Sequence, residues 1–230
     1  MKSMSLRSSR KGQAGFTLVE IAIVLVIIGL LLGGVLKGQE LIENGRVKKA
    51  IADMSAVEVA YTSYLDRFRQ LPGDDGDLAA LQARGAAWAA GVGPTVSGNR
   101  DGVITAAAAT TFAPVTEALG FFQHLRAAGF LSGPASATGQ DAAIGNGWGG
   151  RTGIAVANSQ GRPVAKLLIC TSSVPGKSAR AMDLAIDDGV WNTGSVRATS
   201  GTTTAPVAPG AAAAAAYSDD LYYTVCRDLG

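Results

Sequence analysis

A basic leader followed by a long uncharged apolar run constrains this chain more than any other feature. Glu20 is the only charged residue between Phe16 and Leu36, and the next charged residue is Lys37. The 21 residues of the segment 16–36 would form a helix roughly 31 Å long, which is enough to cross the hydrocarbon core of a bilayer. Residues 16–36 are therefore expected to be a transmembrane helix.

Two ordinary interpretations of this run leave Glu20 unexplained. A cleaved secretory signal would have small residues at a cleavage site after the apolar run, and no A-x-A-like site follows Leu36. A plain transmembrane anchor accounts for the length and for the basic flank on the cytoplasmic side. It does not account for an acid within the span, which costs about 2.5–3.5 kcal/mol on insertion scales and so normally has a partner.

The sequence Gly15–Glu20, GFTLVE, resembles the N-terminus of type IV pilins and type II secretion pseudopilins. The resemblance rests on a small residue, an aromatic residue, an acid at the fifth position after Gly15 and a long apolar run. It implies that residues 1–15 are a leader peptide, that prepilin peptidase cleaves between Gly15 and Phe16, and that Phe16 is then N-methylated. It also implies contacts with other pilin or pseudopilin subunits, with an inner-membrane assembly platform and, before assembly, with lipid.

The position of Glu20 leads to a hypothesis about assembly. A new amino terminus on Phe16 would be a cation, and Glu20 is an anion, in the same low-dielectric environment. Each charge is costly alone and less costly when the two are paired. Glu20 of one subunit is therefore expected to pair with the Phe16 amine of a neighbour and to set the stagger between subunits.

The helix is expected to continue beyond the membrane, with residues 37–70 forming its amphipathic half. Apolar side chains recur there at spacings of three or four, which indicates one buried helix face. They are Val47, Ile51, Met54, Val57, Tyr61, Leu65 and Phe68. Pro72 and Gly73 end the helix. The glycines between residues 29 and 45 favour close packing between subunits, unwinding in a filament, or neither, since glycine is common in membrane helices.

The rest of the chain predicts an α+β fold, in which the long N-terminal helix packs on a C-terminal antiparallel sheet. Residues 71–147 are expected to form helices and loops, with a short helix over 78–90 and an amphipathic helix over 116–131. Residues 148–230 contain short β-prone runs bounded by turn residues, which predict three or four strands. These runs are 153–158, 164–172, 194–199 and 221–227, with a helical turn over 176–184.

The two cysteines, Cys170 and Cys226, lie in two of these predicted strands. In an exported domain an even number of cysteines favours a disulfide, which would tie the last strand to an inner one. Two buried free thiols are the alternative.

Composition and motifs argue against catalysis and nucleic-acid binding. Loss of the four basic residues of the leader would change the formal net charge from +2 to −2, which gives no electrostatic footprint for nucleic acid. The chain has no P-loop, serine-nucleophile or metalloprotease motif. Its one histidine, His124, is expected at a helix surface or an interface.

No cofactor is predicted, but two oxygen-rich loops offer candidate calcium ligands. Calcium takes six to eight oxygen ligands from loops of this kind. The candidates are Asp74, Asp75, Asp77, Asn99 and Asp101. The alternative is that these residues only form turns.

These features predict a structural subunit of a type IV pilus or a type II secretion pseudopilus, and not an enzyme. Before assembly it would be a single-pass inner-membrane protein with its C-terminal domain in the periplasm. The alternative is a non-polymerising single-span membrane protein whose periplasmic domain binds a partner or ligand.

Overall fold

A computed structural model describes residues 15–93, 96, 98–159, 163–210 and 216–229. The chain divides into two compact units, residues 1–42 and residues 43–230. One helix, α1 (Leu18–Phe68), runs through the boundary between them. The predicted leader, residues 1–15, lies outside the described residues except for Gly15.

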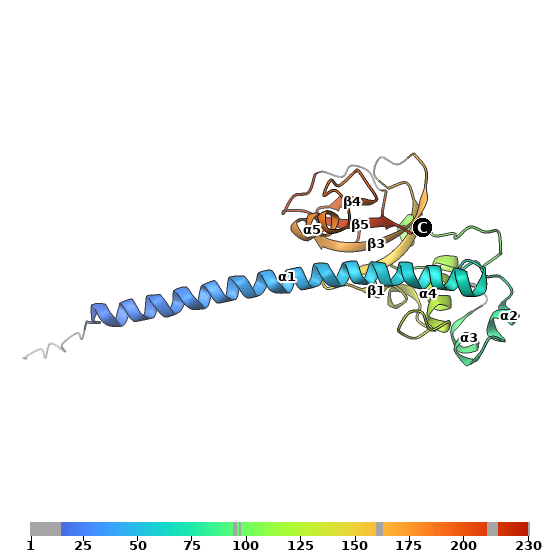
Figure 1. Cartoon of the computed structure of the whole chain (residues 1–230), viewed down its shortest axis with the longest axis horizontal. Coiled ribbons are helices and arrows are strands. Elements are labelled where there is room, and N and C mark those ends of the chain that lie inside the picture. The colour runs from blue at the N-terminus through green and yellow to red at the C-terminus, as the bar shows by residue number, and fades with distance from the viewer. Residues whose placement is uncertain (1–14, 94–95, 97, 160–162, 211–215, 230) are drawn as a thin grey trace, which may run out of the picture. The chain divides into compact units, whose positions relative to one another are not determined.

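The 51-residue helix α1 contains no proline, and its ends have clear local causes. Its last turn is followed by Arg69 with a positive φ of 56°, then by Pro72 and by Gly73 with a φ of 91°. Proline disfavours helical backbone in the residue before it, and glycine accepts the left-handed conformation without a steric penalty. The prediction of one long helix ending near Gln70 is confirmed, and Figure 1 shows α1 as one unbroken helical ribbon.

Among its described residues, the second unit holds four more helices and two short 3₁₀ turns, η1 (Ala108–Thr110) and η2 (Gly139–Asp141). The helices are α2 (Leu78–Gln82), α3 (Ala86–Gly91), α4 (Thr116–Ala127) and α5 (Gly176–Ile186). The single helix predicted over 78–90 is wrong, because Gly85 has a φ of 147° and separates α2 from α3. The helix predicted over 116–131 ends at Ala127, before Gly129 with a φ of 79°.

The described part of the chain holds one five-stranded antiparallel sheet with strand order β1-β2-β3-β5-β4. Its strands are β1 (Ile144–Gly145), β2 (Arg151–Ala157), β3 (Lys166–Pro175), β4 (Val196–Gly201) and β5 (Tyr222–Asp228). The four longer strands match the predicted runs within a few residues. The expectation of three or four strands is corrected to five, because β1 is too short for a sequence pattern and lies in the region predicted to hold only helices and loops.

The sheet is covered differently on its two faces because side chains alternate along a strand. Ile154 and Ile169 belong to the main core with α1, α4 and α5, whereas Leu168 and Cys170 belong to a small second cluster with Phe112. The α1 residues buried in the main core are Val47, Ala50, Met54, Val57, Ala60 and Tyr64. The side of α1 predicted to be apolar is thus the side that is buried, but the prediction omitted Ala50, Ala60 and Tyr64.

Helix α4 packs along the second half of α1 within this unit, as Figure 1 shows. Tyr61 of α1 stacks on Phe121 of α4 with ring centroids 6.0 Å apart. Phe121, Phe122 and Leu125 are completely buried. Burying such side chains is worth about 1.5–3 kcal/mol each, so the apolar face of α1 from Val47 onward depends on tertiary contacts.

Candidate functional site: the N-terminal motif and the anchored half of α1

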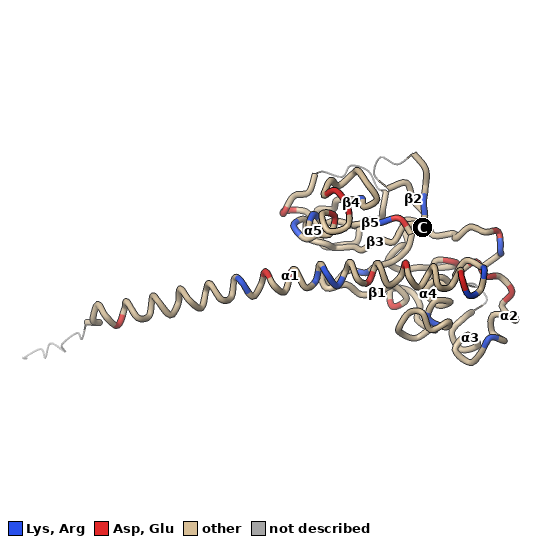
Figure 2. Tube along the Cα trace, in the orientation of Figure 1, with Lys and Arg blue, Asp and Glu red and all other residues tan. Residues whose placement is uncertain are grey.

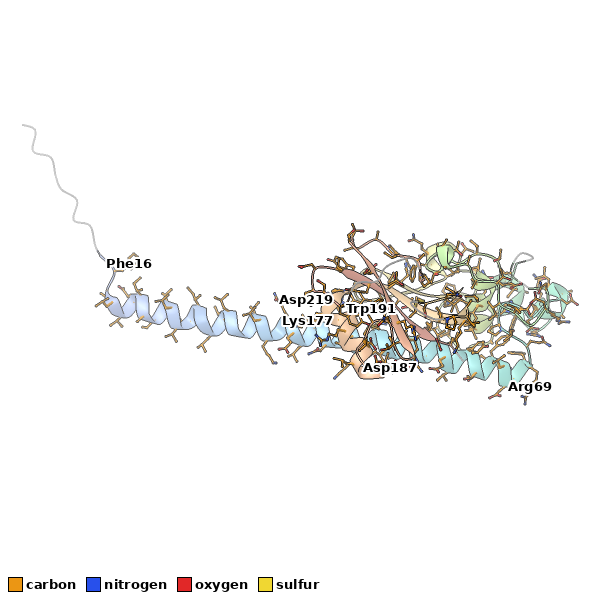
Figure 3. All side chains as sticks on the ribbon, turned by 90° about the horizontal axis from the view of Figure 1, so that it is seen from above. Phe16, Arg69, Lys177, Asp187, Trp191 and Asp219 are labelled. Atoms are coloured by element: carbon orange, nitrogen blue, oxygen red, sulfur yellow. A yellow bond between two sulfur atoms is a disulfide. The ribbon has the colours of Figure 1, made fainter. Side chains whose placement is uncertain are left out.

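The first site is the short segment that precedes α1. Gly15, Phe16 and Thr17 have no regular secondary structure, and the helix starts at Leu18. The side chain of Phe16 is 84% exposed, and Figure 3 shows it pointing away from the start of the helix. The peptide bond between Gly15 and Phe16 therefore lies in non-helical backbone, two residues before the first helical residue.

Thr17 and Glu20 form a reciprocal cap at the start of α1. Glu20 Oε2 accepts hydrogen bonds from the backbone N–H of Thr17 at 2.8 Å and from its hydroxyl at 2.9 Å. Thr17 Oγ1 in turn accepts the backbone N–H of Glu20 at 3.2 Å. This is the T-x-x-E capping box, which satisfies backbone donors that have no partner within the helix. The role of Thr17 was not predicted from the sequence, although the T-x-x-E spacing is typical of a capping box.

The apolar part of α1 makes no core within the first unit. Helix α1 contains a stretch that is long and apolar enough to span a membrane, and none of that stretch is buried. Figure 2 shows the helix uncharged between Glu20 and Lys37. A helix that is apolar on all sides is stable only when lipid or protein covers it.

The second site is a set of contacts around Glu43, where the second half of α1 begins to pack against the rest of the second unit. Glu43 Oε1 accepts hydrogen bonds from Trp148 Nε1 at 2.6 Å and from Ser178 Oγ at 2.5 Å. Arg46 Nη1 lies 3.3 Å from Glu43 Oε2. Partial burial alone would raise the pKa of the Glu43 carboxyl, but the hydrogen bonds from Ser178 and Trp148 and the nearby Arg46 guanidinium together outweigh it and lower the pKa. Nothing local predicts this role, since both donors are more than a hundred residues away in sequence.

Two further links hold the sheet in place. Arg227 of β5 pairs with Glu58 of α1, with Nη2 and Oε2 2.5 Å apart. Cys170 of β3 and Cys226 of β5 are opposite each other on neighbouring antiparallel strands and form a disulfide. The disulfide belongs to the second cluster, on the other face of the sheet from the main core.

A buried carboxylate organises the loop that leaves α1. Asp75 is fully buried, and its Oδ2 accepts the Tyr64 hydroxyl at 2.6 Å and Arg84 Nη1 at 2.6 Å. The Arg84 guanidinium also lies 4.6 Å from the Phe68 ring centre and 5.0 Å from that of Trp88. A buried charge is tolerated only when it is paired and hydrogen-bonded in this way.

His124 does not lie at a helix surface, so that part of its prediction is wrong; it packs where α4 meets other helices. It is fully buried against the rings of Tyr64 and Trp88, and its Nδ1 accepts the backbone N–H of Gly73 at 2.9 Å. Burial lowers the pKa of His124 to about 4, so the imidazole is neutral at pH 7. Its role is to accept a buried backbone donor, a role that depends on the loop after α1 and cannot be read from α4 alone.

The structure brings the two oxygen-rich loops together, as hydrogen-bonding partners. Asp74 Oδ1 accepts the backbone N–H groups of Asn99 and Arg100 at 2.9 and 2.6 Å, and its Oδ2 accepts that of Gly102 at 2.8 Å. Asp77 caps α2, and Asn99 bonds to Asp101. These oxygens therefore accept or share hydrogen bonds within the two loops and at the start of α2.

A separate group of carboxylates follows α5 and was not singled out in the sequence. Asp183, Asp187 and Asp188 each place an oxygen within 4.8 Å of the others. Asp183 accepts the Tyr217 hydroxyl at 2.8 Å, Asp187 accepts the N–H of Val196 at 3.1 Å, and Asp188 accepts that of Val190 at 2.8 Å. Burial raises the pKa of Asp183. These three side chains hold the loop between α5 and β4.

Comparison with known families identifies the N-terminal motif. Residues 10–36 match the family described as "Prokaryotic N-terminal methylation motif". No curated protein and no solved structure matches the chain at a significant level.

The matched residues include the segment before α1, the capping box and the apolar half of the helix. The chain therefore carries the prepilin-type motif of type IV pilins and pseudopilins. With its long N-terminal helix packed on an antiparallel sheet, it has an α+β, pilin-like layout. The motif supports a pilin-like precursor that is processed by prepilin peptidase and assembles with other subunits.

Proposed function

We propose that this chain is a structural subunit of a type IV pilus or a type II secretion pseudopilus. Prepilin peptidase cleaves the precursor between Gly15 and Phe16, and Phe16 becomes the methylated amino terminus. The mature subunit is held in the inner membrane by residues 16–36, with the second unit in the periplasm. It then polymerises with other subunits.

One observation carries the proposal. The methylation motif at residues 10–36 continues without a break into a helix whose second half is built into a folded unit. A subunit of this design would keep its apolar half in lipid before assembly and against other subunits afterwards. Glu20, within the apolar half, is the residue we assign to subunit register, through pairing with a Phe16 amine. In the single chain its carboxylate caps α1 through Thr17, so assembly would exchange or share that contact.

Processing is tested by mass spectrometry of the chain co-expressed with prepilin peptidase. The product should lack residues 1–15 and carry one added methyl group. Gly15→Val should block cleavage, whereas Gly45→Val, a matched change in α1, should not. An added Cβ would contact nothing within 4 Å at either glycine. Equal processing of the two variants would contradict the assignment of the cleavage site.

Polymerisation separates this proposal from the alternative of a non-polymerising membrane protein. Glu20→Ala should insert into the membrane normally but fail to enter filaments, because the paired charge is lost. Glu40→Ala, in a helical turn beyond the apolar run, is the control and should assemble. Filaments are measured by shearing and sedimentation from cells that contain the assembly machinery. A processed wild-type chain that stays in the membrane fraction in those cells would favour the alternative.

We propose that folding and assembly require no cofactor. The carboxylates of Asp74 and Asp75 accept hydrogen bonds from the protein itself, and so do those of Asp183, Asp187 and Asp188. Calcium would have to displace these donors. The melting temperature of the purified protein should therefore be the same in millimolar calcium and in chelator. A rise of several degrees with calcium would show that one of the two acidic groups binds it.

A further inference from the structure

The capping box of Thr17 and Glu20 decides where α1 begins, and with it the backbone conformation around the proposed cleavage site. Within the described residues, the first helical hydrogen bond runs from the Ile21 N–H to the Thr17 carbonyl at 3.3 Å. The Thr17 hydroxyl and the Glu20 carboxylate take the place of a preceding helical turn, because each accepts the backbone N–H of the other residue. Gly15 and Phe16 are thereby left outside the helix.

The competing conformation is an α1 that starts one turn earlier. A helix pairs each N–H with the carbonyl four residues before it, so an earlier start would satisfy the Thr17 and Glu20 N–H groups without the help of side chains. It would also pair the Val19 N–H with the Gly15 carbonyl. An apolar environment favours this extension, because water cannot replace a missing hydrogen-bonding partner there.

Helical backbone at Gly15 would oppose hydrolysis of the peptide bond that follows it. Cleavage adds water to the Gly15 carbonyl carbon and breaks the bond to the Phe16 nitrogen, which leaves a carboxylate on Gly15 and an ammonium group on Phe16. A peptidase must polarise the Gly15 carbonyl oxygen with donors of its own. In a helix that oxygen would already accept the Val19 N–H and would be enclosed by the surrounding turn.

The capped conformation leaves the bond open instead. The side chain of Phe16 is 84% exposed, and a Cβ added at Gly15 would contact nothing within 4 Å. The described side chains therefore cover neither of the two residues that share the bond.

Resting on the function proposed above, we propose that the capping box is a positioning device for prepilin peptidase. Thr17 and Glu20 keep the helix from extending over the bond between Gly15 and Phe16, so that this bond enters the peptidase in non-helical backbone. Glu20 thus has a task in the precursor that needs only a hydrogen-bond acceptor. That task is separate from the charge that we assign to subunit register.

Thr17→Val removes the hydroxyl at nearly constant shape and tests the positioning role. Loss of a helix cap should shift the balance towards the extended helix by about fivefold. The peptidase binds only the non-helical fraction, so KM for the full-length precursor in liposomes that contain prepilin peptidase should rise several-fold while kcat stays the same. Thr17→Ser restores a capping hydroxyl and should restore KM. Thr62→Val is the matched control, because the Thr62 hydroxyl bonds only to carbonyls of its own helix.

The carbonyl carbon chemical shift of Gly15 reports the conformation directly. Solid-state NMR of the precursor in bilayers without peptidase should give a non-helical shift for the wild type and Thr17→Ser. In Thr17→Val the shift should move towards the helical value. An unchanged KM in Thr17→Val, or a lower kcat with an unchanged Gly15 shift, would overturn the positioning role.

Glu20→Gln separates the two tasks of Glu20. Glutamine still accepts an N–H in a capping box, but it carries no charge to pair with an amino terminus. The variant should therefore be cleaved with the wild-type KM and then fail to enter filaments, whereas Glu20→Ala should show both a raised KM and no filaments. A Glu20→Gln chain that is cleaved as poorly as Glu20→Ala would contradict the capping role.

Failure of this inference and failure of the proposed function give different results. If the wild type is cleaved between Gly15 and Phe16 and Thr17→Val is cleaved equally well, the positioning role falls and the subunit function stands. A wild-type precursor that prepilin peptidase leaves uncut defeats both. A raised KM in Thr17→Val that Thr17→Ser and Glu20→Gln do not share supports the positioning role.

Discussion

Residues 15–42 and residues 43–229 depend on different surroundings for their stability. In the first segment the side chains from Ile21 to Leu36 are all exposed and the backbone is satisfied by the helix and its capping box. In the second, the same helix buries one face against α4 and the sheet, and its polar groups pair with distant residues. The first half of α1 thus needs lipid or another protein to cover it, whereas the second half is covered by other elements of its own chain.

This contrast explains why α1 can serve two environments. The first half needs only continuous apolar character, so lipid or another subunit can cover it equally well. The second half is specified by contacts that fit only this fold, such as Glu43 with Trp148 and Ser178. Perturbations of the second unit should therefore cost stability, and loss of the first half should not.

The largest expected effect is loss of the disulfide. Replacing both Cys170 and Cys226 with alanine should lower the free energy of unfolding by roughly 4 kcal/mol, because the bond closes a long loop in the unfolded chain. Urea denaturation of the detergent-solubilised protein measures this. Wild-type protein in reductant is the control and should lose a similar amount. A loss below about 1 kcal/mol would show that the sheet needs no covalent link.

The next largest effect on stability is expected from removing the buried carboxylate of Asp75. Asp75→Ala should cost about 3 kcal/mol, since it leaves the Arg84 guanidinium and the Tyr64 hydroxyl without their partner. Asp77→Ala, in the same loop, removes only a helix cap and should cost about 1 kcal/mol. Comparable losses in the two variants, measured by urea denaturation, would contradict the central role of Asp75.

Acidification should destabilise the second unit through His124. Its pKa is 6.5 when unfolded and about 4 when buried, so the unfolded chain binds more protons between these values. Stability should therefore be constant above about pH 6.5 and fall by about 2–3 kcal/mol towards pH 4. His124→Gln, whose side-chain oxygen can still accept the Gly73 N–H, should lose this part of the pH dependence. The difference between the two stability curves isolates His124 from the carboxylates, and parallel curves would contradict the prediction.

The smallest effect is expected from deleting the first unit. A chain that begins at Glu43 should match the full chain in the stability of the second unit within about 0.5 kcal/mol, because residues 15–42 add nothing to its core. A chain that begins at Ile51 lacks Glu43, Val47 and Ala50 and should lose about 3 kcal/mol. Thermal and urea unfolding of the two fragments measure this. Equal stabilities of the two fragments would show that residues 43–50 do not contribute to the stability of the second unit.

Local patterns were sufficient for much of the fold. The end of α1 follows from Pro72 and Gly73, and the four longer strands follow from β-prone runs between turn residues. Failures occurred where the deciding contact was distant in sequence. Gly85 splits a predicted helix, β1 exists only as the partner of β2, and Tyr64 is buried because Asp75 and Arg84 meet its hydroxyl.

The candidate site divides in the same way. Gly15, Phe16 and Glu20 were singled out because a processing motif is a contiguous string of residues, and the comparison with known families recovers the same segment. Glu43 was not singled out, and the burial of His124 was not predicted, since a carboxylate on a helix or a histidine among aromatic residues has many possible environments.

The sequence by itself determined the membrane-spanning length of the apolar half of α1, the single acid within that half, and the processing motif. Each of these depends on composition and order along one helix, because the backbone of a helix is satisfied locally. Only the tertiary structure decided which face of the second half is buried and where Glu43 and Asp75 find their partners. Those features depend on side chains brought together from far apart in the chain, and their free energy comes from excluding water between elements that no local pattern connects.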